Sequence, residues 1–119
     1  MSKAIIIGIV ESRVVEFSSF SALKKEMNVE YVEVARRGML NDIPVLILVD
    51  EEGKLNDKEV NDDASFMAEE INSYALFADV LVGEAALVKN GEEDLEGFSD
   101  AEADHIVDAM KARGIMFHD

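Results

Sequence analysis

Two adjacent arginines, Arg36 and Arg37, are the residues of this chain best suited to bind a ligand. Each guanidinium carries a planar fork of N–H donors that fits the oxygens of a phosphate or a carboxylate. Basic residues are scarce, 11 in 119, and this pair lies where a predicted strand enters a turn at Gly38. The pair therefore predicts a site for a small anionic ligand. The alternative is that both arginines form ion pairs with the abundant carboxylates.

A predicted helix that begins near Asn61 offers a second group of ligands for an anion. The first backbone N–H groups of a helix point along its axis and favour negative charge. Asn61 and Ser65 lie in the opening turns of that helix. We therefore include both residues in the candidate site.

The sequence lacks the side chains and motifs that usually perform catalysis. The chain has no Cys, no Gly-x-Ser-x-Gly, no phosphate-binding glycine loop and no Gly-x-Gly-x-x-Gly. His105 lies between Asp104 and Asp108, as a general base would, but it falls off the apolar stripe of its helix like an ordinary solvated histidine. His118 lies beside the C-terminus. We predict a protein that is not an enzyme and uses no cofactor.

The acidic clusters do not fit a calcium loop. With Gly97 at the sixth position, the twelfth position is Ala103, where a bidentate Glu is required. With Gly53 at the sixth position, the first ligand would be Leu48. The sequence therefore predicts no metal site.

Negative charge is concentrated in the second part of the chain. Residues 1–49 hold 6 acidic and 6 basic side chains, whereas residues 50–119 hold 20 and 5, so they carry the whole net charge of −15. Such a field repels nucleic acids and anionic membranes. We expect a cytoplasmic protein, with no direct contact to nucleic acid or membrane. The acidity serves solubility, or it forms a surface that mimics DNA phosphate, binds another kind of basic protein, or binds divalent cations.

Hydrophobic periodicity predicts one α+β domain over residues 1–119 with the element order ββα ββα βα. Strands are expected at 4–10, 13–17, 30–36, 43–49 and 79–88, and helices begin at 18–19, 61–63 and 99. The natural packing is a mixed or antiparallel sheet of about five strands with three helices against one face.

Local signals support several of these elements. Ser99 and Glu102 have the spacing of a capping box, and Gly114 is suited to end the last helix. Asn41 and Asp42 indicate a turn between two strands. The middle helix has an apolar face made by Phe66, Met67, Ile71 and Tyr74.

Three stretches of the chain carry a family resemblance. They are Tyr31–Val34 with Leu46–Leu55, Asn61-x-x-Ala64-Ser65, and Asp79–Val88. On these stretches, the region from about Tyr31 to Arg113 resembles a small family of phage- and plasmid-borne proteins that is classed only as a domain of unknown function. The resemblance implies an accessory protein of a mobile element, and many such proteins counter host defences. It implies no catalytic residues.

This background favours two kinds of binding protein. The first sequesters a host nucleotide signal, and it needs cations, a helix N-terminus and aromatic rings. These are supplied by Arg36, Arg37, Asn61, Ser65, Tyr31 and Phe66. Because a small domain has little room for a deep pocket, this site would lie between subunits of a homo-oligomer. The alternative is an acidic DNA mimic, or a protein inhibitor that occupies a basic host defence or DNA-binding protein.

Overall fold

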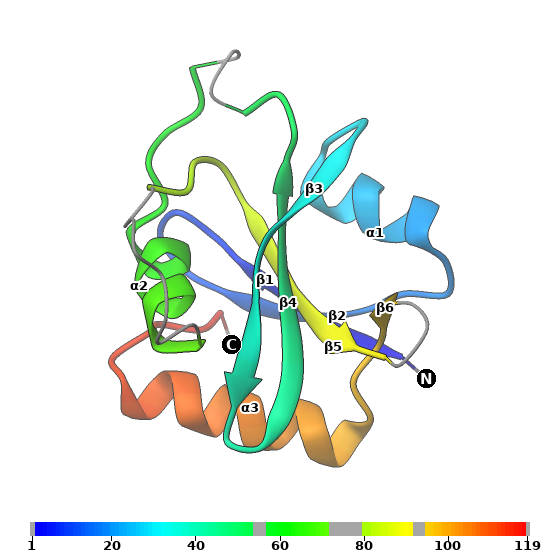
Figure 1. Ribbon diagram of the computed structural model, residues 1–119, viewed down its shortest axis with the longest axis vertical. Helices are drawn as coiled ribbons and strands as arrows, with labels where there is room; N and C mark the ends of the chain where they lie inside the picture. The colour runs from blue at the N-terminus through cyan, green and yellow to red at the C-terminus, as the bar shows by residue number, and fades with distance from the viewer. Residues whose placement is uncertain (1, 54–56, 72–79, 92–94, 119) are drawn as a thin grey trace.

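Pairs of strands alternate with single helices along most of the chain (Figure 1). The computed structural model describes residues 2–53, 57–71, 80–91 and 95–118. The elements are β1 (Lys3–Ile7), β2 (Arg13–Glu16), α1 (Phe20–Met27), β3 (Val32–Leu40), β4 (Ile43–Asp50), α2 (Asp62–Ile71), β5 (Ala85–Asn90), β6 (Leu95–Glu96) and α3 (Asp100–Ala112). The predicted order is confirmed, with β6 as an addition.

The sheet is antiparallel and has the strand order β2-β1-β5-β4-β3, while the short β6 pairs with β5. β1 with β2 and β3 with β4 are hairpins of neighbouring strands. β5 comes from late in the chain and joins the two hairpins. The prediction of an α+β fold with about five strands and three helices is therefore confirmed.

Helices cover both faces of the sheet, so the prediction of helices on one face is wrong. Val45 and Ile47 of β4 pack in a cluster with α2 and α3, whereas Leu46 and Leu48 pack in a second cluster with α1. Figure 1 shows α1 apart from α2 and α3. The physical reason is the run 43–49, which is apolar at every position and so leaves neither face of β4 for water.

β3 and β4 are joined by a two-residue turn at Asn41 and Asp42, as predicted. Both residues have positive φ, 48° and 68°, which is the conformation of a type I′ turn. β3 runs through Gly38 to Leu40, so the predicted turn at Gly38 is wrong. A glycine is required there because a Cβ would collide with the carbonyl oxygen of Ile71 at the end of α2.

The predicted strand 79–88 begins later than expected, at Ala85. Before it, Gly83 has φ of +72°, a left-handed conformation that interrupts an extended strand. Residues 80–82 instead run beside the start of α2, where Val82 forms an isolated bridge with Val60. Other predictions, on Tyr74, on Asp79 and on the acidic residues 92–94, lie outside the described residues.

Helix boundaries follow the predicted caps. The Ser99 hydroxyl accepts a hydrogen bond from the N–H of Glu102 at 3.1 Å, and the Glu102 carboxylate accepts one from the N–H of Ser99 at 3.0 Å. The Ser19 hydroxyl caps α1 in the same way through the N–H of Ala22. Among the helices over the described residues, none is long and apolar enough to span a membrane.

Candidate functional site

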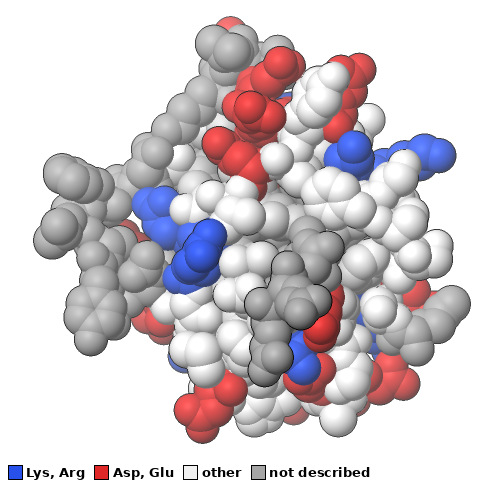
Figure 2. All heavy atoms as spheres, turned by 45° about the vertical axis from the view of Figure 1, so that its right-hand side comes forward, with Lys and Arg blue, Asp and Glu red and all other residues white. Residues whose placement is uncertain are grey.

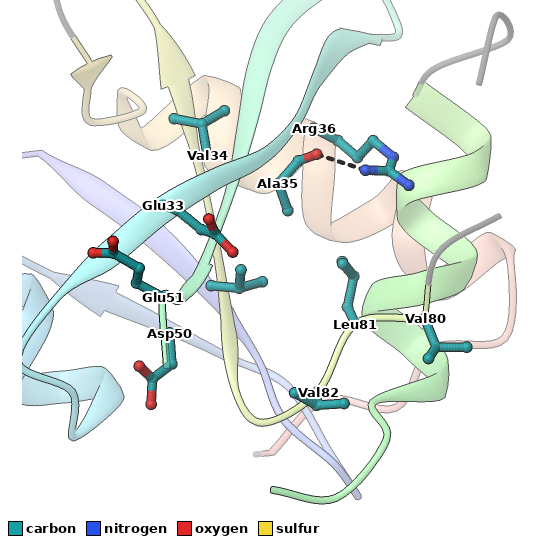
Figure 3. A pocket seen from close by; sticks show the side chains of 10 residues that line it. Glu33, Val34, Ala35, Arg36, Asp50, Glu51, Val80, Leu81 and Val82 are labelled. Atoms are coloured by element: carbon teal, nitrogen blue, oxygen red, sulfur yellow. Dashed lines mark hydrogen bonds between the residues drawn. The ribbon is translucent and has the colours of Figure 1, made fainter. Parts of the chain in front are cut away.

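A cavity of about 280 Å³ lies between the first half of β3, the end of β4 and the segment 80–82. It is lined by residues 33–36, 49–51 and 80–82 (Figure 3). We call it the β3 cavity. Its position depends on two local features, the attachment of the segment 80–82 and a bulge in β3.

Asn61 attaches the wall of the cavity to the rest of the fold. Its side-chain N–H groups donate to the carbonyl oxygens of Ile7 at 2.8 Å and Gly83 at 2.9 Å, and its backbone N–H donates to Leu81 at 2.7 Å. Its side-chain oxygen caps α2 by accepting from the N–H of Ala64 at 2.9 Å. Asn61 is completely buried, so this side chain is committed to structure.

Ser65 holds the same wall one turn later. Its hydroxyl accepts a hydrogen bond from the N–H of Leu81 at 2.9 Å. Leu81 is therefore fixed at both its N–H and its carbonyl group by the first turns of α2. The structure thus brings Asn61 and Ser65 together, but behind the cavity wall.

A β-bulge in β3 turns two neighbouring side chains toward the cavity. Val34 pairs with Leu48 and Arg36 pairs with Ile47, so Ala35 is the extra residue. Ala35 packs against the core cluster of the α2 and α3 face. Arg36 lies on the same face, because Ile47 belongs to that cluster and residues paired across antiparallel strands share a face.

Arg36 and Arg37 point to opposite faces of the sheet. Arg37 pairs with Leu46, which packs on the α1 face. Arg36 is half-buried, and its guanidinium donates to the carbonyl oxygen of Ala35 at 2.7 Å. Only Arg36 therefore lines the cavity, and the two guanidinium groups do not converge on one ligand.

The two aromatic residues of the predicted site also lie apart. Tyr31 is 57% exposed at the start of β3, and Phe66 is 41% exposed on α2. Neither residue lines the cavity. Binding of an anionic ligand by Arg36, Arg37, Asn61, Ser65, Tyr31 and Phe66 stays a prediction, but the described structure does not gather these side chains.

Carboxylates dominate the charge of the cavity. Figure 3 shows Glu33, Asp50 and Glu51 at one end and Arg36 at the other. Asp50 is buried, which raises its pKa, but the ammonium of Lys58 at 2.6 Å and the N–H of Glu52 at 2.9 Å outweigh that effect. The pKa of Asp50 is therefore lowered, and its charge is balanced inside the protein.

Glu33 and Glu51 have no such balance, since neither forms an ion pair with a described residue. Other exposed acids lie near the lining in the chain, as Glu30 and Glu52 do, or are tied to it by the backbone, as Glu59 is through the N–H of Gly83. We call this region the acidic end, and its exposed members are Glu30, Glu33, Glu51, Glu52, Asp57 and Glu59. Figure 2 shows acidic side chains gathered at the top of one face, with basic side chains to either side. An incoming cation therefore meets unbalanced negative charge.

The remaining lining of the cavity is apolar. Val49, Leu81 and Val82 contribute hydrocarbon surface on the side toward which the carboxylate of Glu33 points, whereas the carboxylate of Glu51 is directed outward at the acidic end (Figure 3). This combination suits a group with an aliphatic stem and a cationic head. Pockets for small molecules usually measure about 300–1,000 Å³, so this cavity fits one long side chain better than a whole nucleotide.

Sequence reasoning missed Glu33, Glu51 and the segment 80–82. A usable signal was present at Asp50-Glu51-Glu52, where acids directly follow the most apolar strand and so mark its open end. The segment 80–82 gave no comparable signal, because its valines and leucine suit a strand equally well.

A second hollow lies at the start of α3, lined by residues 97–102 and Ser2. Its charged groups already have partners, and Asp100 pairs with Lys3 at 3.2 Å. Ser99 and Glu102 form the capping box, and Glu102 also pairs with Lys89 at 2.8 Å. Within the ranges that the structure covers, no three His, Cys, Asp or Glu side chains gather closely enough to hold a metal ion.

Comparison of the chain with family models, with curated proteins and with solved structures gives no match. The resemblance to phage- and plasmid-borne proteins therefore stays a prediction.

Proposed function

We propose that this protein is a non-enzymatic binding protein whose acidic end occupies a basic segment of a protein partner. The observation that carries the proposal is the β3 cavity, in which apolar lining lies beside the carboxylate of Glu33, with the carboxylate of Glu51 at the same end and neither in an ion pair with a described residue. A lysine or arginine side chain satisfies both parts of that lining. As the family resemblance implies, we expect the partner in the cytoplasm of a bacterial host.

The charge distribution supports a protein partner. The net charge of −15 repels nucleic acids and speeds the approach of basic proteins. Exposed apolar side chains surround the same region, including Tyr31, Val34 and Val80. A surface that mixes unpaired acids with exposed apolar groups is suited to a folded or peptide partner, whereas a pure mimic of DNA phosphate needs the charges alone.

Titration with a fluorescein-labelled decalysine peptide tests the proposal. We expect saturable binding in fluorescence anisotropy at 50 mM NaCl, weakened strongly at 300 mM NaCl. The double variant Glu33→Gln/Glu51→Gln should weaken binding roughly tenfold, because each carboxylate contributes about 0.5–1 kcal/mol at a partly desolvated rim.

Asp104→Asn/Asp108→Asn is the matched control. Both residues are exposed on α3, and the double variant removes the same charge away from the cavity. We expect less than about a twofold effect, because at 50 mM NaCl charges beyond a Debye length of roughly 14 Å are largely screened. Equal losses in the two double variants would reduce the effect to net charge and overturn the site.

A thermal-shift screen with linear and cyclic nucleotides tests the other prediction. Under the proposed function, no nucleotide raises the melting temperature. A nucleotide shift that Arg36→Ala abolishes, together with no decalysine binding, would replace the proposal with nucleotide sequestration.

A further inference from the structure

Strand β3 forms one edge of the sheet and directs backbone groups outward. Over the described residues it pairs with β4 alone. The N–H of Glu51 donates to the carbonyl oxygen of Tyr31 at 3.1 Å, so this residue pair bonds inward. Inward and outward positions alternate along an antiparallel pair. Val32 and Val34 therefore direct their N–H and carbonyl groups away from β4, toward a position that another strand can take.

The side chains along this edge specify what such a strand would carry. Glu33 faces the cavity, since it pairs with Val49, whereas Val34 lies on the α1 face and is 45% exposed. Side chains of an added strand alternate in the same way. One set meets the carboxylates of Glu33 and Glu51, and the other set lies beside Val34. The pattern that fits is a basic residue at every second position with apolar residues between.

A second copy of this chain does not fit that pattern. Pairing two β3 strands edge to edge would bring the Glu33 residues and the neighbouring acids of both copies together. Like charges on facing strands are destabilising. A basic segment instead gains from every one of these carboxylates, so charge complementarity selects a basic partner.

The bulge at Ala35 limits the length of the pairing. Beyond it the register shifts, so the regular outward edge covers residues 31–34. Bulges and short regular edges are the features by which proteins prevent unlimited strand addition. A single short segment is therefore the expected occupant.

We infer that β3 binds a short extended segment of a basic protein as an added strand, with a lysine or arginine side chain in the β3 cavity. This inference rests on the proposed function, because it specifies how the same acidic end holds its partner. Strand addition requires a particular order of residues in the partner segment and hydrogen bonds from its backbone. Charge attraction alone requires neither.

Peptide order provides the first test. We compare a labelled nonapeptide of alternating Lys and Val with a peptide of the same composition whose valines are grouped at one end. Strand addition predicts that the alternating peptide binds at least about tenfold more tightly, because only its two sets of side chains reach both faces.

Backbone methylation provides the second test. Alternating peptides carrying N-methyl groups on either the Lys or the Val amides retain composition and charge. In an added strand only alternate N–H groups point toward β3. One methylated peptide should therefore lose binding, by roughly 2–10-fold for each hydrogen bond removed, while the other keeps most of it.

A variant pair probes the protein side. Val34→Pro removes an outward N–H but none of the hydrogen bonds to β4, and proline is tolerated at such edge positions. Val34→Ala controls for loss of the side chain. We expect Val34→Pro to weaken binding of the alternating peptide more than Val34→Ala does, with melting temperatures recorded for both. The methylated peptides need no variant, so they test the inference even where Val34→Pro fails to fold.

The outcomes separate the two proposals. Equal binding of the alternating, grouped and both methylated peptides, still weakened by Glu33→Gln/Glu51→Gln, would overturn strand addition and leave the basic partner in place. Absence of binding by every lysine peptide at 50 mM NaCl would overturn both.

Discussion

The two edges of the sheet differ in what surrounds their charged side chains. At β2, the guanidinium of Arg13 pairs with Glu84 at 2.9 Å and donates to the carbonyl oxygen of Glu26 at 3.0 Å. At β3, Glu33 and Glu51 have no partner among the described residues. Both edges expose a valine to a similar extent, Val14 at 40% and Val34 at 45%. Glu16 of β2 is also exposed and forms no ion pair with a described residue. Exposure, edge position and an acid without an ion pair are thus shared, and β3 is distinguished by the cavity beside its two acids.

This difference indicates which edge is built to bind. The β2 edge, with Arg13 already paired and Glu16 as its single acid, offers an incoming chain little electrostatic gain. An edge with unpaired acids beside a cavity offers both attraction and a place for a side chain. The mutations below test this distinction by changing one edge at a time.

The largest effect is expected for Asn61→Ala, which removes the attachment of the cavity wall on the β3 side. The carbonyl oxygens of Ile7 and Gly83 and the N–H of Ala64 all lose their partner. We expect the free energy of unfolding to fall by about 3–5 kcal/mol, measured by urea denaturation, because buried polar groups without partners are costly.

Ser12→Ala is the matched change near β2. Ser12 is fully buried, but its hydroxyl has no hydrogen-bond partner within the described part of the chain. We expect the free energy of unfolding to change by less than about 0.5 kcal/mol, or to rise. A loss comparable with that of Asn61→Ala would contradict this account of the two positions.

Lys58→Met removes the ammonium partner of Asp50 and so leaves another carboxylate without an ion pair on the β3 side. The expected loss is about 1–2 kcal/mol at pH 7, because the carboxylate stays buried while its ammonium partner is gone. In the wild type the folded pKa of Asp50 lies below its ordinary value. Its contribution is therefore complete above that ordinary value and is lost as the pH falls through the folded pKa.

Urea denaturation between pH 7 and pH 3 measures this effect. The difference between wild type and Lys58→Met should shrink toward the acid end, as Asp50 becomes protonated in both. A difference that is constant with pH would mean that Lys58 stabilises the fold through packing of its stem, not through its charge.

Arg13→Met removes the partner of Glu84 at the β2 edge, and we expect it to cost less stability than Lys58→Met. Arg13 and Glu84 are each about one-third exposed, so the expected loss is only about 0.5 kcal/mol. The informative measurement is binding of decalysine. If charge balance distinguishes the edges, this variant should gain a second, weaker site, and an unchanged stoichiometry would show that the cavity matters more than the unpaired acids.

Much of the fold was predictable because short-range chemistry determined it. The capping box of Ser99 and Glu102 and the turn at Asn41 and Asp42 are encoded by a few neighbouring residues. The uninterrupted apolar run 43–49 also indicated that helices cover both faces of the sheet, although the prediction placed all helices on one face. A strand that is apolar at each position needs two covers.

The candidate site was less predictable because it depends on register. One extra residue at Ala35 decides which arginine faces the cavity, and nothing in the local sequence marks that bulge. An asparagine at position 61 is suited both to cap a helix and to bind an anion. Only its complete burial, with its amide bonded to Ile7 and Gly83, assigns it to structure.

The position of β5 in the strand order affects how the chain folds during synthesis. Its residues, 85–90, pair with β1 on one side and β4 on the other, so both early hairpins wait for the same late segment. A ribosome adds about 5–20 residues per second, so the nascent chain carries two unjoined hairpins for several seconds. Their inner edges are the apolar β1 and β4. Over that interval the emerging polypeptide is most exposed to misassembly, and we expect chaperone dependence to end once β5 has left the exit tunnel.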